Sequence, residues 1–315
     1  MSQRGSRQFL GSQGLSLLRA MMLIPLMVLG FVSTPSLGGT AFAQSTITCD
    51  PLTPAASSST VSAATPEASP AATAEFPDDG GELTVFAAAS LTDAFAQIGS
   101  DLEAAHPGLT ITFQTAGSQA LVTQLQEGAT ADVLATANTS TMTTAIESGL
   151  IEGDSVPFTG NRLVIVTPSD NPAGITSLDD LTNDGVKLVI AGSDVPAGSY
   201  AVRAICDHQN DGVEGFANAI SANIVSEETD VRSVLSKVQL GEADAGIVYL
   251  SDAVASEIAG TELNLVEFPD TVPTSATYPI AAVEGGNTEL ANAFIAYVLS
   301  PEGQAVLETY GFELP

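Results

Sequence analysis

From residue 83 to the end of the chain, short apolar runs alternate with segments of helical periodicity, and this alternation restricts the fold to few classes. Leu83–Ala87 is apolar apart from one threonine, and the segment after it repeats apolar residues at helical spacing, namely Leu91, Phe95, Ile98 and Leu102. A strand, a helix and a second strand at this spacing are typical of right-handed βαβ units with parallel strands. The sequence therefore predicts an α/β fold.

The alternation falls into two sets, which predicts two lobes. Further strands are expected near residues 109–115 and 132–136 in the first set, and near 162–167, 187–191, 245–249 and 279–283 after it. A cleft between two such lobes is a natural place for a small ligand. Because the chain crosses between the sets twice, we expect one lobe from residues 81–159 and 274–315 and another from residues 160–273.

The N-terminal residues have the pattern of a secretory signal peptide. Three arginines precede an apolar run over residues 20–32, and a stretch of small residues ends in Ala41-Phe42-Ala43. The alternative is an uncleaved anchor, but the run is shorter than the roughly 20 apolar residues that a membrane span needs. We therefore expect removal of residues 1–43 and a mature protein that works in the periplasm or at the cell surface.

Residues 44–80 are rich in Ala, Ser, Thr and Pro, and such a segment buries too little apolar surface to offset its ordering entropy. We expect a disordered tether that joins the folded part to the membrane. Cys49 lies in this tether and Cys206 in the folded part. Export permits a disulfide between them, whereas a lipid on Cys49 is the alternative, and the sequence leaves both open.

The charge balance excludes several kinds of partner. The chain has 37 acidic and eight basic residues, and loss of the three N-terminal arginines leaves five basic residues and a net charge of −32. A surface this acidic repels nucleic acids and anionic membranes. We expect neither as a partner.

Motifs of enzyme chemistry are missing from the sequence. It has two histidines, His106 and His208, and none of the short motifs of zinc proteases, P-loop enzymes or serine hydrolases. Both histidines are expected at the surface. A hydrolase using Ser90 or Ser118 would need a histidine base within reach, so no catalytic residue is predicted.

Small hydroxyl residues instead follow the first two expected strands. Ser90 comes directly after the first strand, and Ser118 follows Gly117 after the second. Ser90 and Asp93 have the spacing of a capping box, but free N–H groups and a hydroxyl at a helix start also bind anions. Because the carboxyl ends of parallel strands meet at one sheet edge, the two turns are expected to lie together.

The second set contributes three comparable positions. Val195–Tyr200 lies at a loop-to-helix junction, Asp230-Val231-Arg232 at another helix start, and Tyr249 at the end of a strand. Tyr249 is either a packed aromatic residue or a hydrogen-bond donor that faces the cleft. Arg232 is expected to pair with Asp230 and is not counted as a ligand.

Several separate segments of this chain resemble the molybdate-binding periplasmic proteins of bacterial ABC transporters. They are Leu83–Leu91, Val195–Ala201, Asp230–Arg232, Gly246–Ala253, Tyr278-Pro279 and Tyr310-Gly311-Phe312. The resemblance covers nearly all of residues 83–315 in the family's order. It implies a type II periplasmic-binding-protein fold that closes on a tetrahedral oxyanion, molybdate or tungstate, without a cofactor.

The resemblance also implies which groups hold the oxyanion. They are the hydroxyls of Ser90, Ser118 and Tyr249 and the backbone N–H groups of Ala197 and Val231. The second turn departs from the family, because it has one serine where relatives often carry a run, so a slip of one residue would move that role. The expected partner is the membrane permease of a molybdate transporter, and the protein is expected to be a monomer.

Neutral donors would explain how so acidic a protein binds an anion, because donors act at contact distance whereas the long-range field is screened within about 8 Å at physiological salt. Four alternatives remain open. They are a binder of another oxyanion such as sulfate, a ferric-ion binder with clustered tyrosines, an exported α/β serine hydrolase, and an adhesive surface domain.

Overall fold

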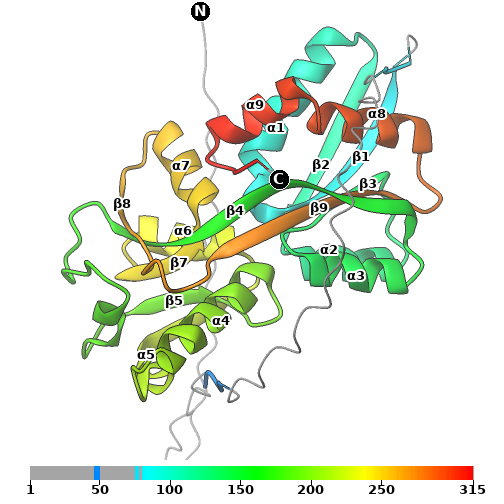
Figure 1. The fold of residues 1–315 in the computed structure, drawn as a ribbon. Helices are drawn as coiled ribbons and strands as arrows, with labels where there is room; N and C mark the ends of the chain where they lie inside the picture. Colours follow the sequence, from blue (N-terminus) through cyan, green and yellow to red (C-terminus); the bar gives the residue numbers. More distant parts are fainter. Residues whose placement is uncertain (1–45, 50–74, 78–79, 315) are drawn as a thin grey trace, which may run out of the picture. The chain divides into compact units, whose positions relative to one another are not determined.

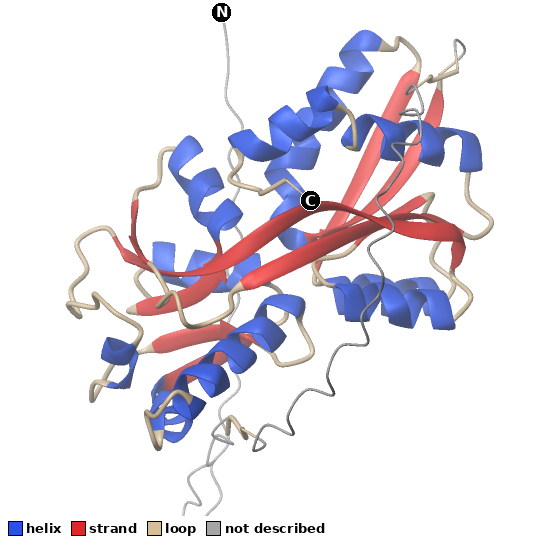
Figure 2. Cartoon of the chain, in the orientation of Figure 1, coloured by secondary structure: helices blue, strands red, loops and turns tan. Residues whose placement is uncertain are grey.

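The computed structural model describes residues 46–49, 75–77 and 80–314, and in it a mixed sheet is flanked by helices (Figures 1 and 2). The sheet of the described chain has nine strands: eight form one hydrogen-bonded path in the order β2-β1-β3-β9-β4-β7-β5-β6, and β8 pairs with β4 beside this path. This arrangement confirms the predicted α/β fold. The signal-peptide prediction lies outside the described residues.

The first half of the sheet is built from βαβ units, as the alternation predicts. Its strands are β1 (Gly81–Ala88), β2 (Leu109–Ala116), β3 (Val133–Ala135) and β9 (Ser275–Val283). β1 pairs in parallel with β2 and β3, whereas β9 is antiparallel to β3. Strands joined in this way carry their connecting turns at one edge.

Helices cover both faces of this half (Figure 2). They are α1 (Thr92–Ala105), α2 (Ser118–Gln126), α3 (Thr139–Glu147), α8 (Thr288–Val298) and α9 (Pro301–Thr309). α2 and α3 lie on one face, where Phe86, Leu121, Leu134 and Met142 are buried together. α1, α8 and α9 lie on the other face, where Phe95 packs against Phe294 with ring centroids 5.6 Å apart.

The second half of the sheet repeats this design with shorter strands. Its elements are β5 (Leu188–Ala191), α4 (Pro196–Asn210), α5 (Phe216–Asn223), β6 (Ile224–Glu228), α6 (Val231–Gln239), β7 (Ala245–Tyr249), α7 (Leu250–Ile258) and β8 (Leu263–Val266). β6 and β8 were not predicted from sequence. Both are partly exposed, and β6 ends in two glutamates, so neither has the apolar run that marks a buried strand.

One long strand joins the two halves. β4 (Ile151–Pro168) pairs with β9 as far as Arg162, and from Leu163 onward it pairs with β7 and β8. The sequence predicted only its C-terminal part, because the exposed residues before Phe158 hide the first part of the strand. The lobe boundary expected at residue 159 falls inside this continuous strand, and the assignment of residues to lobes stays a prediction.

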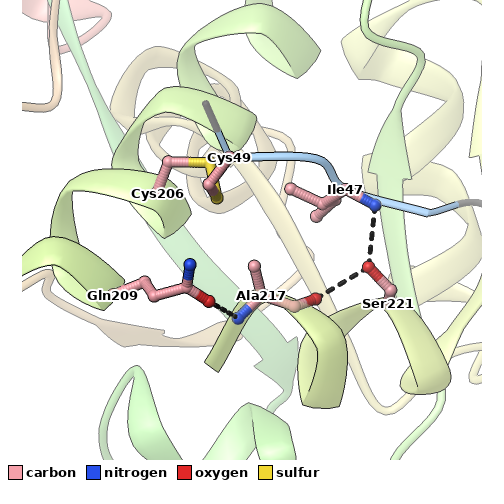
Figure 3. The surroundings of a disulfide bond; sticks show 6 residues. All are labelled: Ile47, Cys49, Cys206, Gln209, Ala217 and Ser221. Carbon is pink, nitrogen blue, oxygen red and sulfur yellow. Dashed lines mark hydrogen bonds between the residues drawn. A yellow bond between two sulfur atoms is a disulfide. The ribbon is translucent and has the colours of Figure 1, made fainter. Parts of the chain in front are cut away.

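Two stretches of the expected tether pack against the folded chain, which corrects the expectation of disorder at those residues. Ile47 is buried, and its N–H donates to Ser221 Oγ at 2.9 Å (Figure 3). Phe76 is also buried, and its ring lies 4.7 Å from that of His106. Apolar side chains at these two points contribute contacts that the overall composition of the segment conceals.

Cys49 forms a disulfide with Cys206 in α4, across 157 residues of sequence (Figure 3). This bond decides between the two fates that the sequence left open, because a cysteine in a disulfide has no thiol to carry a lipid. None of the helices in the described chain combines the length and apolar character that a membrane span requires.

We expect loss of this disulfide to destabilise the fold. A cross-link over so long a loop removes much of the entropy of the unfolded chain, so Cys49→Ala with Cys206→Ala should lower the free energy of unfolding by about 2–4 kcal/mol. Denaturant unfolding of the variant and the parent, with a thiol assay of the parent, measures this. Equal stability of the two proteins would contradict the prediction.

Candidate ligand-binding site

All five residues expected from the resemblance line one small cavity between the two halves of the sheet. Ser90 and Ser118 come from the first half, and Ala197, Val231 and Tyr249 from the second. The cavity is narrow, with a volume of only about 10 Å³ open to the centre of a water-sized sphere. The structure thus brings the five together, and their role in binding stays a prediction.

Ser90 belongs to the short turn Ala89–Leu91 that connects β1 to α1. Its Oγ lies 2.9 Å from the Tyr278 hydroxyl. The capping box with Asp93 does not form, because α1 is preceded by Leu91 and has no side-chain cap. Ser90 is therefore buried at the cavity for a reason other than helix capping.

Ser118 is the first residue of α2, and its Oγ accepts a hydrogen bond from the Ala137 N–H at 3.0 Å. Since that oxygen already accepts, the Ser118 proton is free to point into the cavity. Gly117, directly before Ser118, lies close to the other half of the sheet. A Cβ at residue 117 would be only 2.5 Å from the Thr229 carbonyl oxygen, so a larger residue would push the two halves apart there.

The N–H groups of Ala197 and Val231 belong to the first turns of α4 and α6. N–H groups at these positions have no acceptor within their own helix, and they carry the positive end of the helix dipole. Pro196 at the start of α4 has no N–H, so Ala197 presents the first one of that helix. Asp230 caps α6 by accepting from the Ser233 N–H at 2.9 Å, which leaves the Val231 N–H uncapped.

Tyr249 ends β7 and is fully buried. Its hydroxyl lies near that of Tyr278 but makes no hydrogen bond of good geometry with any residue in the described part of the chain. Burial raises the pKa of Tyr249 well above its ordinary value of 10.0, so the hydroxyl keeps its proton. Tyr249 is both packed against Tyr278 and part of the cavity wall, and its role as a donor stays a prediction.

The nearest charges lie beside the cavity and not in its wall. Arg232 pairs with Asp93 of α1 and lies 2.9 Å from Asp252 of α7, whereas the expected partner Asp230 caps α6 instead. The described residues that line the cavity carry no charge. Arg232 therefore contacts one carboxylate on each half, while the residues that line the cavity are neutral.

A second polar link also joins the halves near the cavity. The Gln119 side-chain amide of α2 donates to the Thr229 carbonyl at 3.0 Å. With the pair between Arg232 and Asp93, it holds the turns of the two halves together around the cavity.

Two buried polar residues at this site were missed from sequence. Tyr278 of β9 and Asn161 of β4 are both fully buried, and the Asn161 amide donates to the Tyr278 hydroxyl at 3.3 Å. Tyr278 appeared in the sequence only as part of a family motif. Asn161 is a polar residue within a strand whose following residues are apolar, and this was the only local signal for it. Its partner Tyr278 lies 117 positions away, so no local pattern shows the contact.

The histidines lie far from both serines. His106 follows the last turn of α1, a helix of 14 residues, so it is about 20 Å from the turn that carries Ser90. His208 was expected at the surface and is instead buried, with Nε2 2.8 Å from Asp179 and its ring against Phe216. His208 is buried by side chains of other elements, such as Phe216 of α5, and the sequence around His208 does not show them.

A cavity lined by N–H and O–H groups from both halves of the sheet has the chemistry of an anion site, because such groups share the charge of the ion. Fold and site together define a two-lobed binding protein of the periplasmic type. A family model described as bacterial extracellular solute-binding protein matches residues 83–313. The chain belongs to this family, whose members work outside the cytoplasm.

Three individual proteins are similar to this chain. The molybdate-binding protein ModA of Mycobacterium tuberculosis is 41% identical over 249 residues, which cover 78% of this chain and 90% of that protein. The substrate-binding domain of a molybdenum ABC transporter from Clostridium difficile, itself described as putative, is 28% identical with a TM-score of 0.56, over 74% of this chain and 99% of that one. The periplasmic molybdate-binding protein of Azotobacter vinelandii shares the fold, at 18% identity and a TM-score of 0.63, over 74% of this chain and 99% of that one.

We expect the buried carboxyl of Asp252 to make stability depend on pH. Burial raises its pKa from 3.8 to about 6, against the opposing effect of Arg232. A raised pKa favours folding in full below pH 3.8, and this contribution is lost as the pH rises to about 6. The stability of Asp252→Asn relative to the parent should therefore increase by up to about 3 kcal/mol between pH 4 and pH 7.

Thermal unfolding of both proteins across this pH range measures the difference. Only the change of this stability difference with pH is used. A constant effect of replacing the carboxyl beside Arg232 therefore does not affect the result. A difference that stays level would show that Asp252 is ionised throughout in the folded protein.

Proposed function

We propose that the mature protein captures molybdate or tungstate outside the cytoplasm and delivers the oxyanion to the permease of an ABC importer. The observation that carries this proposal is the convergence of five neutral donors on one cavity. These donors come from five separate turns and helix starts, and what they share is the cavity that they line. The identity to proteins named for molybdate binding supports the choice of ligand.

The donor set also suits a dianion in an acidic protein. Hydroxyls and helix-start N–H groups neutralise the ligand without a buried cation, and the nearest cation, Arg232, is already paired with two carboxylates. Since the lining groups are neutral, the ligand meets no acidic side chain at contact distance. The net negative charge of the protein then acts only through a screened long-range field.

Closure of the lobes is part of this function. Each half of the sheet supplies some of the donors, so a ligand gains the full set only when the halves are together. We assign residues 81–159 and 274–315 to one lobe and residues 160–273 to the other. β4 passes from one lobe to the other, β9 pairs with it at the boundary, and these two strands form the hinge.

The same geometry argues against the hydrolase alternative. A serine nucleophile needs a histidine within hydrogen-bond reach, whereas His106 lies at the far end of α1 and His208 is bonded to Asp179. We therefore propose a binding protein without catalysis or cofactor. It acts as a monomer, after export directed by residues 1–43, and any attachment to the membrane is through the N-terminal segment.

Thermal unfolding of the exported chain with four oxyanions tests the proposal. A ligand that binds only the folded state at a thousandfold excess over its Kd stabilises that state by about 4 kcal/mol. We expect a large rise in Tm with molybdate and with tungstate and little with sulfate or phosphate. A rise in Tm with sulfate alone would identify sulfate as the ligand in place of molybdate. The absence of a rise with both molybdate and tungstate would overturn the proposal.

We expect Tyr249→Phe to weaken molybdate binding by about tenfold, because it removes one hydrogen bond to a charged ligand and keeps the ring in place. Titration calorimetry measures the Kd. Tyr310→Phe is the matched control, since Tyr310 also packs on the core but does not line the cavity. Equal affinity of Tyr249→Phe and the parent would remove Tyr249 from the binding site.

A further inference from the structure

A buried chain of polar side chains leads from the hinge strands to the cavity. It contains Ser251 of α7, Asn161 of β4, Tyr278 of β9 and Ser90 beside β1, and all four are almost fully buried. The distances along it are 2.8 Å from Asn161 Nδ2 to Ser251 Oγ, 3.3 Å from Asn161 Nδ2 to the Tyr278 hydroxyl, and 2.9 Å from that hydroxyl to Ser90 Oγ. Of these residues only Ser90 has a role in the proposed function.

The orientation of the Asn161 amide is fixed by the backbone. The N–H of Arg162 donates to Asn161 Oδ1 at 2.9 Å, and an N–H requires an acceptor. The oxygen of the amide therefore faces Arg162, and its nitrogen faces Ser251 and Tyr278. An amide nitrogen only donates, so the Tyr278 oxygen is the acceptor in its contact with Asn161.

The direction of the remaining protons follows from this. Burial raises the pKa of Tyr278 well above 10.0, so its hydroxyl keeps a proton. Either hydroxyl could donate in the 2.9 Å contact between Tyr278 and Ser90 Oγ; with Tyr278 as the donor, its oxygen accepts from Asn161 and its proton points to Ser90. Ser90 then accepts from Tyr278, and its proton is left for the cavity that it lines.

The second serine of the cavity is oriented in the same way by a simpler device. The Ala137 N–H donates to Ser118 Oγ, and a backbone N–H has no other role than donor. With Tyr278 as the donor to Ser90, each serine oxygen accepts one hydrogen bond from the protein, and each serine proton is available to the cavity. For Ser118 the backbone imposes this direction, whereas for Ser90 it is imposed by side chains on the two hinge strands.

We propose that Tyr278 and Asn161 are positioning residues that direct the Ser90 hydroxyl proton into the cavity, so that the site offers donors only. This inference rests on the proposed function, because it assigns the source of polarity at the same site. Without Tyr278 the Ser90 hydroxyl would rotate freely and would face an anion with its lone pairs for part of the time. The chain also passes through β4 and β9, which places it where the two halves of the sheet meet.

A double-mutant cycle on the exported chain tests the inference. Titration calorimetry with sodium molybdate gives Kd values for the parent, Tyr278→Phe, Ser90→Ala and the double variant. Each single change should weaken binding by about tenfold. If Tyr278 acts through Ser90, the double variant should bind about as tightly as Ser90→Ala alone, because without the Ser90 hydroxyl the Tyr278 hydroxyl has nothing to orient.

Two further measurements separate orientation from general damage to the fold. Tyr297→Phe, which removes a hydroxyl from α8 away from the cavity, should bind like the parent. Asn161→Asp keeps the shape of the side chain, but its carboxylate accepts the Tyr278 proton and reverses the chain. Asp252, whose pKa is raised to about 6, titrates beside the cavity in both proteins, so the parent serves as the reference. Molybdate affinity of Asn161→Asp should fall more steeply than that of the parent as the pH rises from 5.5 to 8.

Multiplicative losses in the cycle, or an Asn161→Asp variant with the same pH profile as the parent, would overturn the inference and leave the proposed function intact. A parent protein that binds neither molybdate nor tungstate would overturn the proposed function, and this inference with it. If Tyr278→Phe does not fold, the pH profile of Asn161→Asp decides the question alone.

Discussion

The N–H groups in the first turn of a helix have no acceptor within that helix. The candidate site of this protein depends on this constraint, because two such helix starts lie at one cavity. Two sheet halves bring their connecting turns to one cavity, where the first turns of α4 and α6 face the turns that carry Ser90 and Ser118. The positive ends of these helices make the cavity attractive to an anion without a charged side chain in its wall. Gly117 and Gly198 permit the close backbone approach, since a Cβ at either would lie 2.5 Å or less from a carbonyl oxygen.

Charged side chains lie beside this cavity, and the arginine among them is paired with carboxylates. Arg232 lies between Asp93 on one half and Asp252 on the other, so a single cation links the halves and offsets part of their negative charge. A free arginine at the same place would bind anions of many shapes, whereas a paired one leaves selection to the neutral donors and to the size of the cavity. The acidic surface and the anion site are compatible for this reason.

The polar chain from Asn161 to Ser90 connects the cavity with the two strands on which the halves meet. Its members are buried, and each makes at least one hydrogen bond, as a polar group in such a position requires. On the outside of the second half, the disulfide between Cys49 and Cys206 and the burial of Ile47 hold part of the N-terminal segment against α4 and α5. The segment thus belongs to the fold at these points.

The sequence by itself determined the α/β class, the main strands, and through family resemblance the five residues that line the cavity. These features are local, because periodicity, helix starts and short motifs are each contained within a few neighbouring residues. The tertiary structure alone decided the partners of Cys49, Arg232 and His208, the edge strands β6 and β8, and the place of Tyr278. Ser90 and Tyr278 are 188 positions apart, and no local pattern encodes which of many polar residues will meet once the strands are packed.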